Sequence, residues 1–258
     1  MQLEGKVAAI TGGTAGIGLG IAEAFLAEGA QVALMARNQT KGDAVVADLN
    51  VGERCVFITG DAMVQADVEG FVDATDKAFG SVDILVNNAG GAGDLQPLVN
   101  LSDETFDETM KWNVYSTFWA SRRAVPAMIE RGWGRVINIS STEGKVGKPA
   151  FTAYSTAKHA INGMTKAVAQ EVGAAGVTVN AICPGLVITD IVKANGPATA
   201  QAMGLTFDEM VDMFAQEAAI KRPNTVEEVA AMAVFLASDA GGGVTGATLS
   251  VDGGTSPY

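Results

Sequence analysis

Seven short runs rich in valine and isoleucine, separated by longer stretches of helical periodicity, constrain the fold of this chain more than any other feature. The runs read, in order, KVAAIT, QVALMA, CVFIT, VDILVN, GRVINIS, VTVNAIC and ATLSVDG. Strands of a parallel sheet are buried on both faces, so they read as nearly continuous apolar runs, and each needs a crossover to reach the next strand. The pattern therefore predicts an α/β fold with one doubly wound parallel sheet and helices on both faces.

The chain of 258 residues shows no internal repeat, linker or composition shift, so we expect a single domain over residues 1–258. Hydrophobic residues make up 48% of it and charged residues 18%, which is enough apolar surface for a large core. About seven strands in one open sheet fit this length.

Segment 186–222 is the least sheet-like part of the chain. Inside it, Thr206 and Glu209 have the spacing of a capping box, and Met210, Val211 and Phe214 follow on one helical face. A short amphipathic helix after the carboxyl end of a strand can cover the crevice where α/β proteins bind ligands. We interpret 186–222 as a substrate lid; an ordinary packing helix is the alternative.

The net charge of -12 argues against a role in binding nucleic acid, because such proteins neutralise phosphates with lysine and arginine. Cys55 and Cys183 lack zinc-type spacing, so we predict no metal site and expect both thiols to be reduced. The N-terminus lacks the pattern of a secretion signal, and no apolar run is long enough to cross a membrane. These features favour a cytoplasmic protein.

The first apolar run leads directly into TGGTAGIG at 11–18. Ile17, Ile21, Ala24 and Phe25 then share one helical face, so this glycine-rich stretch joins a strand to a helix. Glycines there let backbone N–H groups approach a pyrophosphate at the positive end of a helix. A tight turn without a ligand is the alternative.

The stretch YSTAK places Tyr154 and Lys158 four residues apart, on one face of a predicted helix. A nearby ammonium favours the phenolate and lowers the pKa of a phenol, so this pair could exchange a proton with a ketone oxygen. Ser141 follows the run GRVINIS, at the edge of the sheet where ligands bind. Taken singly, the Tyr/Lys spacing also fits a chance occurrence and the serine an ordinary turn residue.

Six motifs together resemble the short-chain dehydrogenase/reductase family: TGGTAGIG, NNAG at 87–90, KWNVYS around Asn113, NISS ending at Ser141, YSTAK, and PGLVIT at 184–189. They follow the family order and spacing, and the match extends from about Gly5 to Gly254. The resemblance implies a Rossmann-type fold and an NAD(P)-dependent enzyme acting on CH–OH groups. It also implies a homotetramer, assembled through helix faces near 102–131 and 152–173.

The resemblance also assigns catalytic roles. Tyr154 would be the acid/base, and Lys158 would lower its pKa and hold the nicotinamide ribose. Ser141 would orient and polarise the substrate carbonyl. Asn113 would hold a water that links Lys158 to solvent.

The same resemblance implies a set of cofactor contacts in addition to Tyr154 and Lys158. Gly12, Thr14 and Ile17 would line the pyrophosphate, and Asp61 and Ala62 would reach the adenine. Asn88 and Gly90 would lie on the adenosine side, and Val187 and Thr189 would contact the nicotinamide carboxamide. The stretch DAMV departs from the usual Asp-Val of the family, but a backbone contact at Ala62 would survive this change.

Arg37 bears on the choice between NADP and NAD. In NAD enzymes an acidic residue about 20 residues beyond the glycines binds the ribose 2′-hydroxyl, whereas a nearby arginine accommodates a 2′-phosphate. Here Ala36 stands where the acid would be and Arg37 follows it. We therefore favour NADP, the alternative being that Arg37 is an ordinary surface charge.

Within the family, STEGKVGKPAFTAYSTAKHA and VDGGTSPY are most similar to 3-oxoacyl carrier-protein reductases and polyketide-type ketoreductases. We expect an NADP-dependent enzyme that interconverts a ketone, such as a 3-oxoacyl thioester, and a secondary alcohol. An NAD-dependent secondary-alcohol or 3-hydroxyacid dehydrogenase is the alternative, followed by a non-catalytic dinucleotide sensor. Lys145 and Lys148 could meet the phosphate of a thioester substrate or simply lie in a solvated loop.

Overall fold

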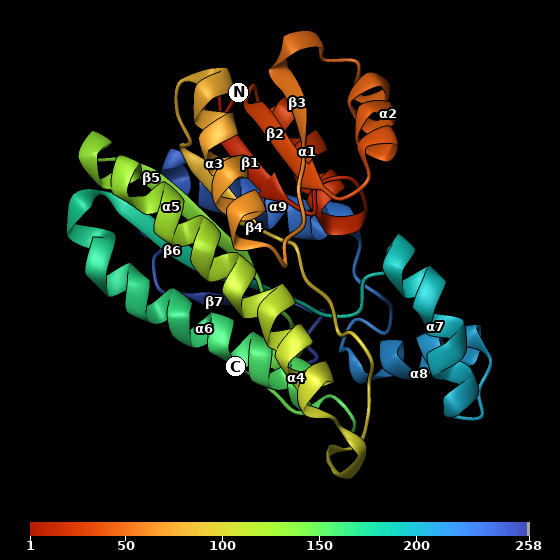
Figure 1. The fold of residues 1–258 in the computed structure, drawn as a ribbon. Helices are drawn as coiled ribbons and strands as arrows, with labels where there is room; N and C mark the ends of the chain where they lie inside the picture. The colour runs from red at the N-terminus through yellow and green to blue at the C-terminus, as the bar shows by residue number, and fades with distance from the viewer. Residues whose placement is uncertain (257–258) are drawn as a thin grey trace.

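The computed structural model describes residues 1–256 and contains, within them, a seven-stranded parallel sheet (Figure 1). The strands are β1 (Val7–Thr11), β2 (Gln31–Ala36), β3 (Cys55–Thr59), β4 (Ile84–Asn87), β5 (Gly134–Ile139), β6 (Val177–Pro184) and β7 (Thr248–Val251). Each coincides with one of the apolar runs. Every residue of β1, β5 and β6 is buried, as expected for strands covered on both faces.

The strands lie in the order β3-β2-β1-β4-β5-β6-β7. Strand β1 therefore pairs with β2 on one side, where Ile10 is opposite Leu34, and with β4 on the other, where Ile10 is opposite Val86. The direction of winding reverses here. In doubly wound sheets, ligands bind in the crevice outside the carboxyl ends of the strands at this point.

Helices cover both faces of the sheet. One face carries α1 (Gly16–Ala27), α2 (Gln39–Leu49) and α9 (Val226–Ala237); the other carries α3 (Gln65–Phe79), α5 (Ser116–Arg131), which follows α4 (Asp103–Met110), and α6 (Thr152–Val172). Ile10 packs with Ile21 and Phe25 of α1 in one core, whereas its neighbour Ala9 enters the other core with Phe71 of α3. The predicted doubly wound Rossmann-type fold is confirmed.

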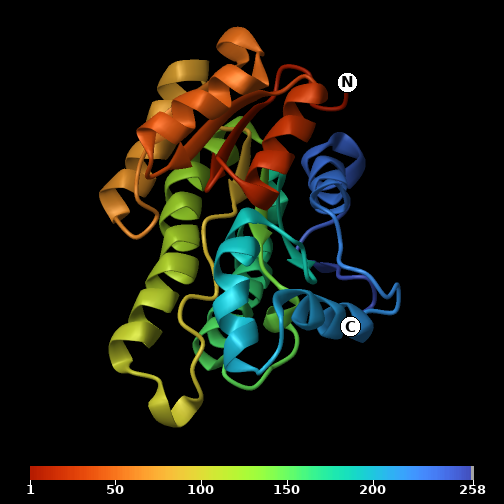
Figure 2. The ribbon, with the colours of Figure 1, turned by 90° about the vertical axis from the view of Figure 1, so that its right-hand side faces the viewer.

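Segment 186–222 contains two helices, α7 (Asp190–Ala202) and α8 (Phe207–Glu217), which pack together beyond the carboxyl ends of the strands (Figures 1 and 2). Helix α8 begins at the predicted capping box, in which the Thr206 N–H donates to Glu209 Oε2 over 2.8 Å. Helix α7 was not predicted, because Gly196 and Pro197 interrupt its helical pattern. Gly196 suits this place, since a Cβ there would lie 2.2 Å from the Phe207 ring.

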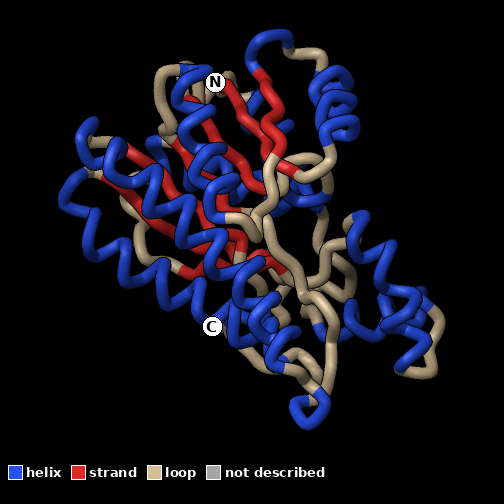
Figure 3. Tube along the Cα trace, viewed as in Figure 1, coloured by secondary structure: helices blue, strands red, loops and turns tan. Residues whose placement is uncertain are grey.

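The loops that follow the strands gather at one edge of the sheet, next to α7 (Figure 3). This arrangement brings segments that are far apart in the sequence to one crevice. No helix among residues 1–256 is long and apolar enough to cross a membrane. The same residues hold no cluster of three or more His, Cys, Asp or Glu side chains that could bind a metal ion.

Candidate active site

The glycine-rich turn joins β1 to α1 at the β1–β4 crevice. Gly12 has a φ of +66°, in the left-handed region that favours glycine. A Cβ on Gly18 would lie 2.4 Å from Asn88 Nδ2 and 2.5 Å from the Gly12 carbonyl oxygen, so only glycine fits there without a shift. Thr14, which is 8% exposed, and Ile17 lie in the same turn. The Gly12 N–H donates to the Met35 carbonyl over 2.8 Å, so these glycines serve to bring the turn close to Asn88 and the start of α1 to the crevice.

Asn88 holds this turn against the end of β4. Its Nδ2 donates to the carbonyl oxygens of Thr11 and Gly12, each over 3.0 Å, and its N–H donates to Thr11 Oγ1 over 3.0 Å. Thr11, which the sequence did not single out, thus links β1 to the loop after β4. Because both amide hydrogens of Asn88 are used within the protein, a contact between Asn88 and the adenosine part of a cofactor stays a prediction.

The N-terminus of α1 suits a pyrophosphate. Its N-cap residue is Ala15, and within residues 1–256 no side chain caps this helix. Helices α3 and α6 likewise lack a side-chain cap, whereas asparagine, serine or threonine side chains cap α2, α4, α7, α8 and α9. The first N–H groups of α1 therefore point toward the crevice without a side-chain acceptor, at the positive end of the helix dipole. These residues fit the phosphates of a dinucleotide.

The other predicted cofactor residues follow β2, β3, β4 and β6, at the same edge of the sheet: Arg37, Asp61, Ala62, Gly90, Val187 and Thr189. Thr189 lies against the glycine turn, since a Cβ on Gly16 would come within 3.1 Å of its side chain. Asp61 Oδ1 accepts the Met63 N–H over 2.9 Å, which shapes the turn after β3. Tertiary structure therefore brings the predicted contact residues to one crevice.

Arg37 is exposed at the end of β2. In the described part of the chain, its guanidinium makes no ion pair or hydrogen bond, and the preceding residue is the half-buried Ala36. The position thus offers a positive charge and no competing carboxylate. Both features suit a 2′-phosphate.

Ser141, Tyr154 and Lys158 converge where β5 ends against α6. Ser141 lies just beyond β5 and is 7% exposed, whereas Tyr154 is half-buried. Lys158 is 4% exposed, and its Nζ donates to the Ile139 carbonyl over 3.0 Å and lies 5.4 Å from the centre of the Tyr154 ring. Ser141 is close enough to Tyr154 to influence the pKa of the phenol. The three side chains can therefore act on one substrate oxygen.

The electrostatics of Tyr154 differ from the sequence-based expectation. We expected Lys158 to lower the pKa of the phenol; instead, burial and the nearby Glu143 raise this pKa, and Ser141 opposes them only in part. Burial also lowers the pKa of Lys158 to about 8, so the ammonium is a weaker positive partner than an exposed lysine. Tyr154 is therefore protonated at neutral pH, as a proton donor requires.

Asn113 lies in a π-helical turn, Lys111–Tyr115, between α4 and α5. It is fully buried; its Nδ2 donates to the Gly91 carbonyl over 3.0 Å, and its Oδ1 accepts the Gly91 N–H over 3.2 Å. The side chain thus fixes the loop after β4, where Gly90 leaves space for it: a Cβ on Gly90 would lie 2.4 Å from Asn113 Oδ1. The water that the resemblance implies at Asn113 stays a prediction. A π-helical turn often marks a functional site.

Glu143 also belongs to this site, although sequence analysis assigned it no role. Its side chain is 11% exposed, and its Oε2 accepts hydrogen bonds from Ser141 Oγ and, over 3.1 Å, from Thr142 Oγ1. The only signal in the sequence is its position two residues after the predicted catalytic serine. Buried contact with that serine became visible only in the fold.

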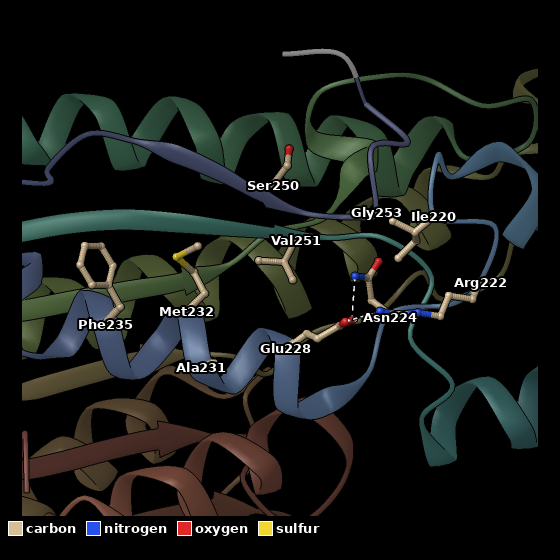
Figure 4. A pocket seen from close by; sticks show the side chains of 10 residues that line it. All are labelled: Ile220, Arg222, Asn224, Glu228, Ala231, Met232, Phe235, Ser250, Val251 and Gly253. Carbon is tan, nitrogen blue, oxygen red and sulfur yellow. Dashed lines mark hydrogen bonds and ion pairs between the residues drawn. The ribbon is translucent and has the colours of Figure 1, made fainter.

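A cavity of about 560 Å³ lies elsewhere, between α9, β7 and the segment before α9 (Figure 4). Met232, Phe235 and Val251 form its apolar wall, and Asn224 Nδ2 donates to Glu228 Oε2 over 3.0 Å at one end (Figure 4). Its lining does not include the catalytic candidates of the crevice. We therefore build the functional interpretation on the crevice.

Comparisons with known proteins show similarity over nearly the whole chain. The family model described as enoyl-(acyl carrier protein) reductase matches residues 12–256. The D-beta-hydroxybutyrate dehydrogenase of Cupriavidus necator is 38% identical over 261 residues, which cover 98% of each chain. The 3-oxoacyl-(acyl-carrier-protein) reductase of Haemophilus influenzae is 34% identical over 252 residues, again 98% of each chain.

A solved structure shares the whole fold. It is a variant of the actinorhodin polyketide ketoreductase, crystallised with NADPH. Its TM-score with this chain is 0.93 at 34% sequence identity, and the match covers 100% of this chain and 99% of the ketoreductase.

Proposed function

The chain belongs to the short-chain dehydrogenase/reductase family, and from this premise we propose that it interconverts a ketone and a secondary alcohol with NADP as its cofactor. The observation that carries the proposal is the convergence of Ser141, Tyr154 and Lys158 beside the glycine-rich turn. A 3-oxoacyl thioester is one ketone of this class, as the name of the Haemophilus relative suggests. The NADPH in the ketoreductase crystal supports the choice of cofactor.

A bound nicotinamide dinucleotide supplies the hydride in reduction and takes it up in oxidation. In reduction, Tyr154 gives its phenolic proton to the carbonyl oxygen, and this proton and the hydride together convert C=O to CH–OH. The raised pKa of Tyr154 keeps that proton available at neutral pH. Ser141 hydrogen-bonds the same oxygen, and Lys158 stabilises the negative charge that develops on Tyr154.

Arg37 supports the preference for NADP, because its free guanidinium can pair with a 2′-phosphate. The test is a pair of titrations of the purified protein with NADPH and NADH, followed by tryptophan fluorescence and checked by calorimetry. We expect tighter binding of NADPH, and we expect Arg37→Asp to shift the preference toward NADH. Tighter binding of NADH by the unchanged protein would overturn the choice of NADP; binding of neither would overturn the proposed function.

A second candidate is an NAD-dependent 3-hydroxyacid dehydrogenase. The observation in its favour is the 38% identity to a protein named D-beta-hydroxybutyrate dehydrogenase. Oxidation of 3-hydroxybutyrate with NAD, faster than reduction of any ketone with NADPH, would favour this candidate. The catalytic roles of Ser141, Tyr154 and Lys158 would be the same.

We further propose that α7 and α8 form a lid over the crevice and that the enzyme works as a cytoplasmic homotetramer. Lys148 Nζ, in the loop before α6, lies 2.7 Å from Glu217 Oε2 of α8, which supports closure of this segment over Ser141. The free, buried thiols of Cys55 and Cys183 suit a reducing compartment. The exposed apolar side chains on α5, considered below, support assembly.

A further inference from the structure

Glu143 places a carboxylate beside the reacting groups. It lies in the 3-10 turn Thr142–Gly144, directly after Ser141, and its side chain is 11% exposed. Its Oε2 accepts the hydroxyl proton of Ser141, and Glu143 also acts electrostatically on Tyr154, whose pKa it helps to raise. The carboxylate therefore lies beside both the serine and the phenol.

The positive charges around Glu143 are already engaged. Lys148 Nζ is 3.8 Å from Glu143 Oε1 but only 2.7 Å from Glu217 Oε2, so the ion pair with Glu143 is the weaker of the two. Lys145 Nζ donates to Ser250 Oγ over 2.7 Å, and Lys158 Nζ donates to a backbone carbonyl. Of these lysines only Lys148 forms an ion pair with Glu143, and it pairs more closely with Glu217, so Glu143 keeps most of its negative charge.

One oxygen of Glu143 remains available. Among residues 1–256, Oε1 accepts no hydrogen bond, because the lysine at 3.8 Å is beyond hydrogen-bond distance. An ionised carboxylate accepts hydrogen bonds but donates none. A hydroxyl group of a bound molecule therefore finds an acceptor at Glu143, whereas a second carboxylate meets a like charge.

The hydrogen bond that Ser141 donates must also change its acceptor when a substrate binds. Under the proposed function, the Ser141 hydroxyl donates to the substrate carbonyl, yet in this structure it donates to Glu143 Oε2. A hydroxyl on the carbon next to the carbonyl can take the place of Ser141 as the donor to Glu143, which frees the serine proton for the carbonyl oxygen. A carboxylate near the carbonyl offers no such donor.

We propose that Glu143 is a specificity-determining residue that selects ketones with a hydroxyl group on the adjacent carbon and disfavours ketones that carry a carboxylate near the carbonyl. The corresponding alcohols are vicinal diols. This inference rests on the proposed function of the crevice, because it takes the carbonyl oxygen to lie between Ser141 and Tyr154.

The test compares four small ketones that share the reacting CH₃–C=O group: butan-2-one, 3-hydroxybutan-2-one, 3-oxobutanoate and its methyl ester. With the unchanged enzyme and its preferred cofactor, we expect kcat/KM to favour 3-hydroxybutan-2-one over butan-2-one, and the ester over the acid, each by a factor on the order of ten. The isosteric substitution Glu143→Gln should shrink the ester-to-acid ratio by about the same factor. Glu53→Gln, which removes an exposed carboxylate before β3, at the opposite end of the strand from the crevice, is the matched control and should leave both ratios nearly unchanged.

An ester-to-acid ratio of kcat/KM that stays the same in Glu143→Gln would overturn the inference while leaving the proposed function intact. A preference of the unchanged enzyme for the acid over the ester would do the same. Circular dichroism and cofactor binding show whether the variant is folded. If the variant is not folded, the inference is tested by the two kcat/KM ratios of the unchanged enzyme, hydroxyketone to butan-2-one and ester to acid. Absence of cofactor binding and of turnover with every ketone would instead overturn the proposed function, and the inference with it.

Discussion

Tyr154 is the residue on which the proposed chemistry depends most directly. Tyr154→Phe keeps the half-buried ring but removes the hydroxyl that donates the proton. We expect turnover to fall by about a hundredfold to ten-thousandfold, the usual contribution of a positioned acid or base. Steady-state assays with the best ketone provide the measurement. Calorimetric titration should find cofactor affinity within about twofold of the original, since the phenol is not the main cofactor anchor.

Lys158 makes stability depend on pH in a defined window. Burial lowers its pKa to about 8 from the ordinary value of 10.5, so between these values the unfolded chain binds more protons than the folded one. The free energy of unfolding attributable to this group therefore rises with pH, by about 1–2 kcal/mol between about pH 8 and pH 9.5. Above about pH 10 the raised pKa of Tyr154 has the opposite effect, because the folded chain then binds more protons than the unfolded one and the free energy of unfolding falls as the pH rises.

Urea unfolding of the unchanged protein and of Lys158→Met, at the two ends of that window, measures this contribution. The methionine cannot titrate, so the gain should appear only in the unchanged protein. An equal pH response in both proteins would show that Lys158 is not buried as a charged group.

At the scale of elements, the glycine turn and α1 depend on close packing. Gly18→Ala would place a Cβ 2.4 Å from Asn88 Nδ2 and 2.5 Å from a backbone oxygen, so the start of α1 must shift. We expect a loss of stability of about 1–3 kcal/mol, together with weaker dinucleotide binding, because the same N–H groups face the pyrophosphate. Thermal unfolding and cofactor titration measure the two effects.

Gly70→Ala is the matched control for this substitution. Gly70 lies on the exposed side of α3, with no atom within 4 Å of an added Cβ. Alanine there should stabilise the protein by up to about 1 kcal/mol, through its helix propensity and the smaller entropy of the unfolded chain. Loss of cofactor affinity in this variant as well would mean that the glycine turn is not the cause.

The whole molecule presents an uncovered apolar surface on α5. Phe118 and Ile129 are 41% and 42% exposed, and Tyr115, in the π-helical turn before α5, is 51% exposed. This surface lies in the range 102–131 through which the family resemblance implies assembly. We expect the protein to sediment as a tetramer and Phe118→Glu to shift it toward smaller species, because a charge cannot be buried unpaired in an interface. Val64→Glu, at an exposed apolar residue outside that range, is the control and should leave the tetramer intact.

The sequence by itself determined the strands, the doubly wound sheet and the start of α8, because these depend on local periodicity, glycine turns and capping residues. It also indicated Tyr154 and Lys158 as a pair, since four residues of helix place two side chains on one face. These features depend on neighbours in the chain, and a single sequence contains that information.

Tertiary structure alone decided the contact of Glu143 with Ser141, the π-helical turn around Asn113 and the rise in the pKa of Tyr154. Asn113 is buried by the loop after β4, and the turn after β5 packs against α6. The contact of Glu143 with Ser141 joins residues only two apart, but distant segments bury it. Helix α7 was missed for a related reason, since packing of Gly196 against Phe207 outweighs its poor helix propensity. Burial and electrostatics are properties of the folded surroundings, and the pattern of residues along the chain does not specify them.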